Sequence, residues 1–236
     1  MANYLVIAAG SGIGQAVTNQ LRARNDQVFT TARNQAIITP DALLDARDFL
    51  AVEAVFEQAL ASMGTLDGVV NCAGSLLLKS AGMTSQEHYQ STIDASLTTA
   101  FATVRAAGKH MSSGGAVVLI SSAAAMEGLA NHEAIAAAKA GILGLMLSAA
   151  ASYASMNLRV NAVAPGLIET PLTAAITGNE TSRKLSEAMH ALGRLGKPED
   201  VARAIVFLLD PANSWITGQV LAVDGGLSRI RPKMKG

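Results

Sequence analysis

Short apolar runs of strand length alternate along this chain with stretches in which apolar residues recur at helical spacing. The runs predict strands at 4–9, 27–31, 43–44, 66–70, 115–121, 158–162 and 219–223. The periodic stretches predict helices at 15–24, 48–63, 85–107, 131–155, 180–191 and 198–209. The run at 115–121 is apolar almost throughout, as in strands that a parallel sheet buries on both faces. The alternation therefore predicts an α/β fold: a doubly wound parallel sheet of about seven strands with helices on both faces.

The connections between these elements contain signals of their own. Thr84 and Glu87 have the spacing of a capping box, which predicts the start of the long helix through about Ala107. Only nine residues, 33–41, join the second and third strands, and Pro40 interrupts them. Because a parallel crossover needs about 10–12 residues, we expect its helix to be stunted or missing. The sequence contains no linker, repeat or low-complexity tract, so residues 1–236 are predicted to form a single domain.

A glycine-rich loop follows the first strand directly and precedes the first helix. It comprises Gly10, Ser11, Gly12, Ile13 and Gly14. Glycines allow the backbone to approach a pyrophosphate closely, and the free N–H groups at the start of a helix point towards it. Ordinary tight turns also use glycine pairs, so the loop alone is weak evidence. The order of strand, glycine loop and helix favours a dinucleotide site in a Rossmann-type domain.

Composition narrows the class of protein further. Of the 236 residues 50% are hydrophobic and 15% are charged, which indicates a large buried core. The 18 basic residues balance the 18 acidic ones, so net charge does not favour binding to nucleic acid or to an anionic membrane. The basic C-terminal segment 229–235 is interpreted as a solvated tail.

Three observations bear on cellular location. Cys72 is the single cysteine, which excludes an intrachain disulfide, and we interpret it as a small buried residue. The first strand begins within a few residues of Met1, so we expect no cleaved signal. The most apolar helical stretch, around 140–151, is interpreted as too short for a membrane span of about 20 residues. The sequence thus predicts a soluble, cytoplasmic protein without a membrane partner.

Seven segments are similar, in order and spacing, to signatures that occur together in one enzyme family. Residues 8–14 are similar to T-G-x-x-x-G-x-G, although Ile7 and Ala8 occupy its first two positions, and 71–74 is similar to N-N-A-G. The other five segments are 121–122, 161–170, 194–199, 217–218 and 224–226. Over its whole length the chain resembles the short-chain dehydrogenase/reductase family. The resemblance implies a Rossmann-type domain that binds a nicotinamide dinucleotide.

The resemblance also implies which residues contact the cofactor. It assigns contacts to the glycine loop, to Asp45 near the adenine, to Lys139 at the nicotinamide ribose, and to Asn71, Ala73, Gly74, Pro165, Gly166, Ile168 and Thr170. An ordinary loop acid and a solvated helix lysine are the simpler alternatives for Asp45 and Lys139. Ala32 stands where NAD-preferring members carry Asp, and the cationic Arg33 follows it. We therefore expect Arg33 to pair with the 2′-phosphate of NADP(H), with NAD less favoured and no metal.

The catalytic positions are where this chain departs from the family, which uses a Ser, a Tyr and a Lys four residues after the Tyr. Ser122 and Lys139 match, but Ile135 occupies the Tyr position and Ser96 that of a supporting Asn. The candidate catalytic residues are Ser122, Lys139 and His132, which lies one helical turn before Ile135. For Ser122 the alternative is a strand-ending hydroxyl. For His132 a capping or surface position is the simpler interpretation, and a substitute proton donor is the other.

The predicted function is that of a NADP(H)-dependent oxidoreductase for a carbonyl or alcohol substrate, with an atypical active site that lacks the usual Tyr. Two alternatives stay open: a catalytically silent NADP-binding sensor or partner subunit, and a structural subunit of a hetero-oligomer of related chains. Residues 167–192 are expected to form a substrate lid with an apolar wall of Leu172, Ile176, Leu185 and Met189. Arg183 and Lys184 can meet an anionic group there, but exposed charges are the simpler account.

Assembly is predicted from the resemblance and from small residues on two long helices. The family implies a homotetramer or homodimer in which long helices pack in pairs. Small side chains allow close approach of helices, and here they are Ala100, Ala102, Ala149, Ala150 and Ala151. We therefore expect a homotetramer with two-fold axes, and no nucleic-acid partner.

Overall fold

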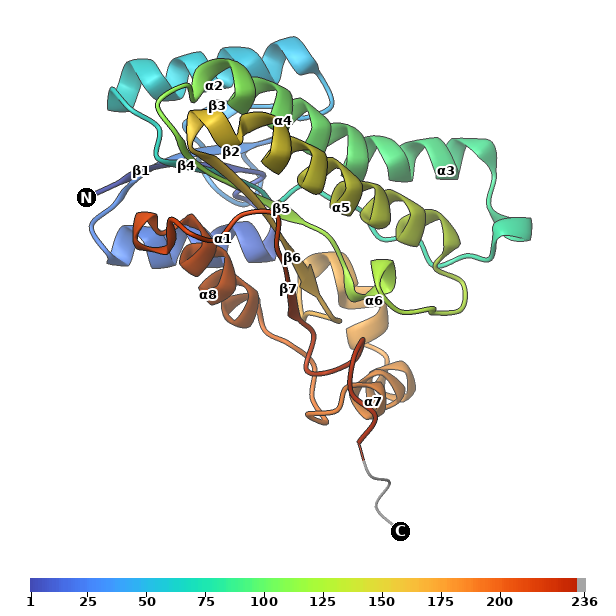
Figure 1. Cartoon of the computed structure of the whole chain (residues 1–236). Coiled ribbons are helices and arrows are strands. Elements are labelled where there is room, and N and C mark those ends of the chain that lie inside the picture. Colours follow the sequence, from blue (N-terminus) through green and yellow to red (C-terminus); the bar gives the residue numbers. More distant parts are fainter. Residues whose placement is uncertain (233–236) are drawn as a thin grey trace.

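The computed structural model describes residues 1–232, which form a seven-stranded parallel sheet between two layers of helices (Figure 1). The strand order is β3-β2-β1-β4-β5-β6-β7, so the chain winds outwards from β1 in one direction and then in the other. This arrangement confirms the predicted doubly wound α/β fold. Of the basic C-terminal segment, residues 233–235 lie outside the described part of the chain.

The observed elements follow the predicted order closely. The strands are β1 (Asn3–Ile7), β2 (Gln27–Ala32), β3 (Ala42–Leu43), β4 (Gly68–Asn71), β5 (Gly115–Ile120), β6 (Leu158–Pro165) and β7 (Val220–Val223). The helices are α1 (Gly12–Ala23), α2 (Phe49–Met63), α3 (Gln86–Ile93), α4 (Thr99–His110), α5 (Glu133–Tyr153), α6 (Ala174–Thr177), α7 (Glu180–Met189) and α8 (Pro198–Leu209).

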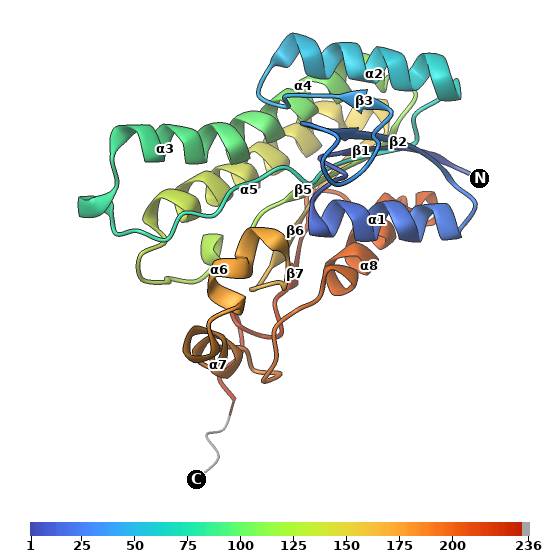
Figure 2. The same cartoon turned by 180° about the vertical axis from the view of Figure 1, so that it is seen from behind.

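Two hydrophobic clusters fasten the helical layers to the sheet. Helices α1 and α8 cover one face, and α2, α4 and α5 cover the other, as the two opposite views show (Figures 1 and 2). In the first cluster Leu21 of α1 and Ile205 of α8 pack on Val118 of β5 and its neighbours. In the second, Phe56 of α2 and Met146 of α5 pack on the opposite face. Every residue of β6 is buried, which explains why this strand is apolar along most of its length.

The connection between β2 and β3 is as short as the sequence predicts. Residues 33–41 are all described, and they form bends rather than a helix. Thr30 and Asp41 hold the two ends together, since the Thr30 amide and hydroxyl both donate to the Asp41 carboxylate at 2.7 and 2.6 Å. Without a crossover helix, this loop lies beside the carboxyl ends of β1 and β2.

The start of the long helix differs from the prediction. Thr84 does not cap it, because its hydroxyl donates to the Ser80 carbonyl in a preceding 3₁₀ turn. Ser85 is the cap, and its Oγ accepts the His88 amide at 3.2 Å. The capping-box prediction was therefore wrong by one residue. The helix then runs on through a π-helical segment, Asp94–Thr98, into α4.

Helix α5 is longer than the sequence interpretation allowed. With the turn that follows it, Glu133–Met156 has the length and composition of a helix that can cross a membrane, so the prediction that it is too short was wrong. Core helices of folded domains meet the same criterion. Here 44% of the most apolar window is buried, and α5 packs against β6 and α4.

Candidate functional site

The candidate nucleotide site lies at the carboxyl ends of β1, β2, β3 and β4, where a doubly wound sheet usually binds its ligand. A cavity of about 360 Å³ is open there. Six predicted cofactor residues line it together: Gly10, Ser11, Arg33, Asp45, Ala73 and Gly74. The tertiary structure thus brings the glycine loop, the end of β2 and the end of β4 around one space.

The glycine loop is shaped as a cradle at the N-terminus of α1. Ser11 caps the helix, since its Oγ accepts the Gly14 amide at 3.0 Å. A Cβ at Gly14 would lie only 2.5 Å from the Ala8 carbonyl oxygen, so no larger residue fits without a backbone shift. Ala8 itself has a φ of +58°, a left-handed conformation that glycine adopts more easily. The loop is therefore built for close approach to a phosphate, even though alanine replaces its first glycine.

Two further contacts fix the loop from outside. Gln15 donates from Nε2 to the Gly10 carbonyl at 3.0 Å, a contact that the sequence pattern did not predict. A Cβ at Gly12 would lie 2.9 Å from Cγ2 of Thr170, so the glycine loop and the segment after β6 touch. Ile13 packs in the core beneath the loop, beside Ile168. The predicted residues Gly12, Thr170 and Ile168 therefore meet around the start of α1.

The cationic end of the site contains two arginines and one carboxylate. Arg47 forms an ion pair with Asp45, and its hydrogen bond lowers the pKa of that carboxyl to about 2. Among residues 1–232, Arg33 makes no ion pair, and it lies exposed at the same cavity. The Asp45 charge is thus neutralised locally by Arg47, which leaves Arg33 available to an anion. No pattern in the sequence pointed to Arg47, because an arginine two residues after an acid does not by itself indicate an ion pair.

The turn after β4 is held by Asn71, which is buried. Its Oδ1 accepts the Ala73 amide at 2.8 Å, and its Nδ2 donates to Thr103 on α4 at 3.0 Å. The side chain therefore shapes the Ala73–Gly74 wall of the cavity. Cys72 lines the same wall, and burial raises the pKa of its thiol to about 12, so the thiol stays protonated.

A second cavity, of about 210 Å³, lies beside the first at the ends of β5 and β6. Ser122, His132 and Ile135 line it together, as do Pro165 and Gly166. Ser122 Oγ accepts the Ala124 amide at 3.2 Å, so the hydroxyl proton is free to bond to a substrate oxygen. Ile135 presents a hydrocarbon where the resemblance expects a phenol.

His132 occupies the N-cap position of α5. Its Nδ1 lies 2.7 Å from the Ala130 carbonyl oxygen, a contact that a proton on Nδ1 satisfies. Among the described residues no protein group bonds to Nε2, so this atom is available to the cavity.

Lys139 lies one turn beyond Ile135 and is almost fully buried. Its Nζ donates to the Ile120 carbonyl at 2.8 Å and lies close to Gly74. Burial lowers the pKa of Lys139 to about 8. An ammonium has three N–H donors, so two remain when one is bonded to Ile120, which fits binding to a sugar hydroxyl.

The π-helical segment before α4 contains a buried polar group that is not satisfied. Ser96, at the position of the family's Asn, is 1% exposed, and its Oγ has no hydrogen-bond partner within residues 1–232. π-Helical turns are frequent at functional sites. Ser91, Ala95 and Thr99 of the same stretch line the nucleotide cavity, which the sequence analysis did not predict.

Residues of the segment after β6 line this cavity, but only part of the expected wall faces it. Ile176 and Met189 line it, whereas Leu172 and Leu185 point to solvent, so the prediction was wrong for the latter two. Buried His190 ties the segment down. Its Nε2 accepts the Leu167 amide at 3.2 Å, and its Nδ1 lies 2.6 Å from the carbonyl oxygen of Ser186.

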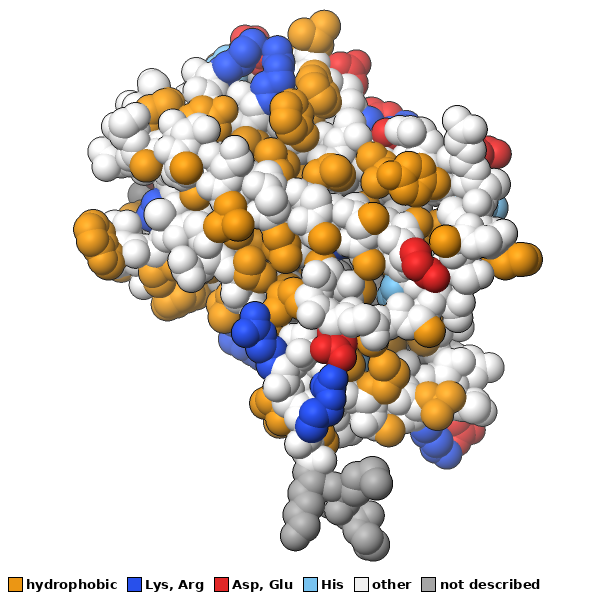
Figure 3. Space-filling view, turned by 45° about the vertical axis from the view of Figure 1, so that its right-hand side comes forward, with side chains coloured by type: hydrophobic (Ala, Val, Ile, Leu, Met, Phe, Trp, Pro, Cys, Tyr) orange, Lys and Arg blue, Asp and Glu red, His pale blue; other side chains and the backbone are white. Residues whose placement is uncertain are grey.

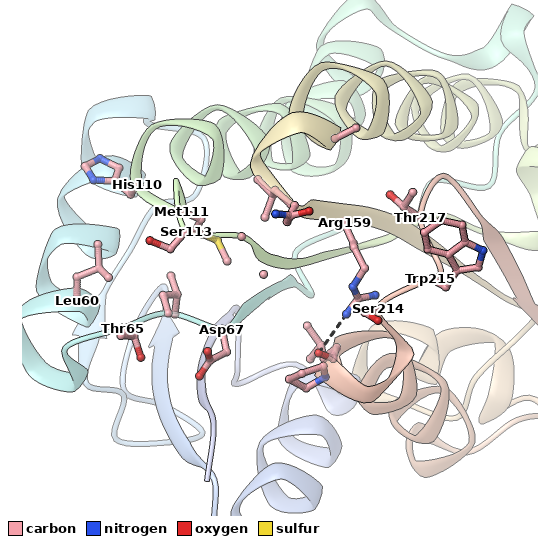
Figure 4. A pocket seen from close by; sticks show the side chains of 18 of the residues that line it. Leu60, Thr65, Asp67, His110, Met111, Ser113, Arg159, Ser214, Trp215 and Thr217 are labelled. Carbon is pink, nitrogen blue, oxygen red and sulfur yellow. Dashed lines mark hydrogen bonds between the residues drawn. The ribbon is translucent and has the colours of Figure 1, made fainter.

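A wider cavity of about 690 Å³ lies at the opposite edge of the sheet, and Figure 4 shows its side chains. It contains no predicted site residue. Arg159, at its wall, donates to the carbonyls of Leu208, Ile216 and Asp210 and so fastens the end of α8.

Comparisons with known proteins identify the family of this chain. Residues 7–228 match a family model described as enoyl-(acyl carrier protein) reductase. Carbonyl reductase family member 4 of Danio rerio is 36% identical, covering 98% of this chain and all of that protein. Cis-4-hydroxycyclohexanecarboxylate dehydrogenase of Sinomonas cyclohexanicum is 35% identical, with 96% of each chain covered. The 3-oxoacyl-[acyl-carrier-protein] reductase FabG of Escherichia coli is 33% identical, covering 96% of this chain and 97% of the enzyme.

Solved structures agree equally well. ElxO with NADP bound superposes with a TM-score of 0.88 at 30% identity, covering 96% of this chain and 99% of that one. A short-chain type dehydrogenase/reductase from Mycobacterium ulcerans superposes with a TM-score of 0.91 at 31% identity, covering 98% of this chain and 91% of that one. Fold, site and relatives together define an oxidoreductase that uses a nicotinamide cofactor. More closely, the chain belongs to the short-chain dehydrogenase/reductase family.

Proposed function

We propose that this protein is a NADP(H)-dependent oxidoreductase that interconverts a carbonyl compound and its alcohol at an active site without the usual Tyr. The observation that carries this proposal is the joint placement of Ser122, His132 and Ile135 around one cavity, beside the glycine-loop cavity. The Lys139 ammonium lies close to Gly74 of the glycine-loop cavity and can bind the nicotinamide ribose. When bound, NADPH supplies the hydride that reduces the carbonyl carbon and leaves as NADP⁺.

The residues present fit this cofactor. The glycine loop leaves no room for side chains at Gly14 and Gly12, which suits close approach of a pyrophosphate. Arg33 is the unpaired cation at the adenosine end, and a charge-assisted contact to a 2′-phosphate contributes about 1.5–3 kcal/mol. The NADP-bound state of the related ElxO supports the same choice.

The chain's own residues must position the substrate oxygen and deliver its proton. The Ser122 hydroxyl donates to the carbonyl oxygen, and one donor to a developing oxyanion is worth about 3–4 kcal/mol. Ile135 has no proton to give, and loss of a positioned acid lowers the rate by about 10²–10⁴. We assign the proton to His132 Nε2, directly or through a water. The N-terminus of α5 opposes this role, because the helix dipole disfavours a charged imidazole there.

A catalytically silent NADP-binding protein is the second candidate, and the buried Ile135 favours it specifically. In that case the cofactor cradle is kept, and the reaction is lost with the phenol. A structural subunit of a hetero-oligomer of related chains is a further candidate without catalytic activity. Both predict NADPH binding without turnover.

Turnover measured alongside cofactor binding separates the candidates. Native protein, Ser122→Ala and His132→Ala are assayed for NADPH oxidation against aldehydes, ketones and quinones, with NADPH affinity measured by fluorescence. Ser113→Ala and His88→Ala are matched controls, since Ser113 is exposed at the opposite edge and His88 lies on α3. Loss of turnover in the first pair only, with NADPH affinity kept, supports the enzyme. Tight NADPH binding without turnover in the native protein supports the silent protein.

We also propose a cytoplasmic homotetramer or homodimer, although not for the reason given by the sequence. Ala100, Ala102, Ala149 and Ala150 are buried within the chain and are not available to a partner, whereas Ala151 is exposed. The outward apolar residues of the same helices are Phe101 and Leu147, 48% and 57% exposed. Figure 3 shows hydrophobic side chains across the middle of one face of the molecule. Light scattering at micromolar concentration tests the proposal, and a monomer contradicts it.

A further inference from the structure

The polar groups that line the candidate substrate cavity are almost all committed to the protein itself. His190 bonds to Leu167 and Ser186 through its two nitrogens. Thr173 donates to the Ile168 carbonyl at 2.5 Å, and the Ser186 hydroxyl donates to Ser182 at 2.8 Å. Satisfied groups in a wall offer little to a ligand. The donors left are the Ser122 hydroxyl and, when protonated, His132 Nε2.

Among residues 1–232, no lysine, arginine, aspartate or glutamate lines the same cavity. The nearest cations of the lid are already paired. Arg183 bonds to Glu169 and Glu187, and Lys184 bonds to Glu180 at 2.7 Å. An anionic substrate group would therefore find no free cation in the cavity wall, and its desolvation would go uncompensated.

The remaining wall is hydrocarbon and the space is small. Leu76, Leu129, Ile135, Ile176 and Met189 face the cavity. Its volume of about 210 Å³ is below the roughly 300–1,000 Å³ typical of sites for drug-sized ligands. One polar spot in an otherwise apolar cavity favours a ligand with one polar atom.

We propose that the substrate is a small, uncharged and mostly apolar compound with a single ketone or aldehyde, or the matching alcohol. Its oxygen lies at Ser122 and His132, and its hydrocarbon body fills the space between Ile135 and the lid. This inference rests on the proposed function, because it assigns the cavity to that reaction's substrate.

Binding can be measured apart from turnover. Native protein saturated with NADP⁺, which cannot reduce a ketone, is titrated calorimetrically at pH 7 with cyclohexanone, methyl 4-oxocyclohexanecarboxylate and 4-oxocyclohexanecarboxylate. We expect cyclohexanone and the ester to bind, and the acid to bind at least about 100-fold more weakly than the ester, because its carboxylate is unpaired in the cavity.

Two lid variants sharpen the test. Met189 lines the cavity, so Met189→Arg places a cation there. Leu185 lies on the same helix outside the cavity lining and is 65% exposed, so Leu185→Arg places its cation in solvent. We expect Met189→Arg to reduce the ratio of ester affinity to acid affinity by about tenfold, because the new cation pairs with the carboxylate of the acid. Leu185→Arg should leave this ratio unchanged. Equal narrowing by both variants overturns the assignment of the cavity.

The outcomes separate this inference from the proposed function. Acid binding as tight as ester binding overturns the inference, whether or not NADPH is consumed. So does the absence of binding by both neutral ligands. Selective binding of the neutral ligands with no NADPH turnover supports the inference about the cavity and contradicts the reductase.

Discussion

Under the proposed function, replacing Ile135 by Tyr restores the phenolic proton donor that the family carries at this position. Ile135 is 4% exposed, and part of its side chain faces the 210 Å³ cavity, so a larger ring has space on that side. Lys139 follows four residues later on α5, on the same helical face. At pH 7 the lysine is mostly protonated, since burial lowers its pKa only to about 8. Its ammonium therefore favours the phenolate that forms when a new Tyr gives up its proton.

The expected gain follows from the size of general acid catalysis. A positioned acid contributes about 10²–10⁴ in rate, or roughly 3–5.5 kcal/mol of barrier. His132 already supplies part of this effect in the native protein under our proposal, so we expect Ile135→Tyr to raise kcat about 10²-fold. The larger ring also crowds its neighbours. If the cavity does not accommodate it, the free energy of unfolding should fall by about 1–3 kcal/mol.

The assay is NADPH oxidation with one neutral ketone, at saturating cofactor, for native protein, Ile135→Tyr and Ile135→Phe. The Phe variant has the same ring without the hydroxyl, so the Tyr/Phe ratio isolates the proton donor from the change in cavity shape. Thermal unfolding and NADPH affinity confirm that each variant is folded and loaded. A folded Ile135→Tyr that binds NADPH normally but turns over no faster than Ile135→Phe would refute the assignment of this cavity to catalysis.

Three further changes test other parts of the structure. Ala32→Asp with Arg33→Leu should weaken NADPH binding by at least about tenfold and favour NADH, because the Arg33 charge at the adenosine end is lost and an acid takes its place; equal affinity of the native protein for both cofactors contradicts this. Ala8→Gly should raise the free energy of unfolding by about 1 kcal/mol, since Ala8 has a φ of +58°; chemical denaturation measures it, and no gain contradicts it. Burial lowers the pKa of Lys139 from 10.5 to about 8, so the unfolded chain binds this proton more tightly than the folded protein does. Below pH 8 this difference lowers the free energy of unfolding by about 3 kcal/mol. The native free energy of unfolding should therefore rise between pH 8 and 10.5, and Lys139→Met should remove this rise while it weakens NADPH binding; a rise that persists in the variant contradicts the assignment.

The fold was readable from the sequence because its signals are local. Apolar runs and helical spacing depend on neighbours within a few residues. They located all seven strands of the sheet along the chain. The nine residues between β2 and β3 were too few for a helix, and the structure has none there. The cap of the long helix was misplaced by one residue, because Thr84 and Ser85 carry the same chemistry and only the backbone geometry chooses between them.

The candidate site was readable only in part. The order of strand, glycine loop and helix located the nucleotide end, and position relative to the family motifs located Ser122, Ile135 and Lys139. No local signal indicated that Asp45 is neutralised by Arg47, or that Gln15 holds the glycine loop. Such side-chain pairs depend on rotamers and loop shape.

The segment after β6 shows most clearly what tertiary structure decides. The sequence offered four apolar residues as one wall, yet only Ile176 and Met189 face the cavity. Their direction is set by how the lid helices are anchored, through buried His190 and the amide of Leu167. The sequence by itself determined the order of elements, the glycine loop and the absence of a phenol at position 135, because each is a property of consecutive residues. Which side chains share the cavity, and that none of them is a free charge, was decided only when distant segments packed together.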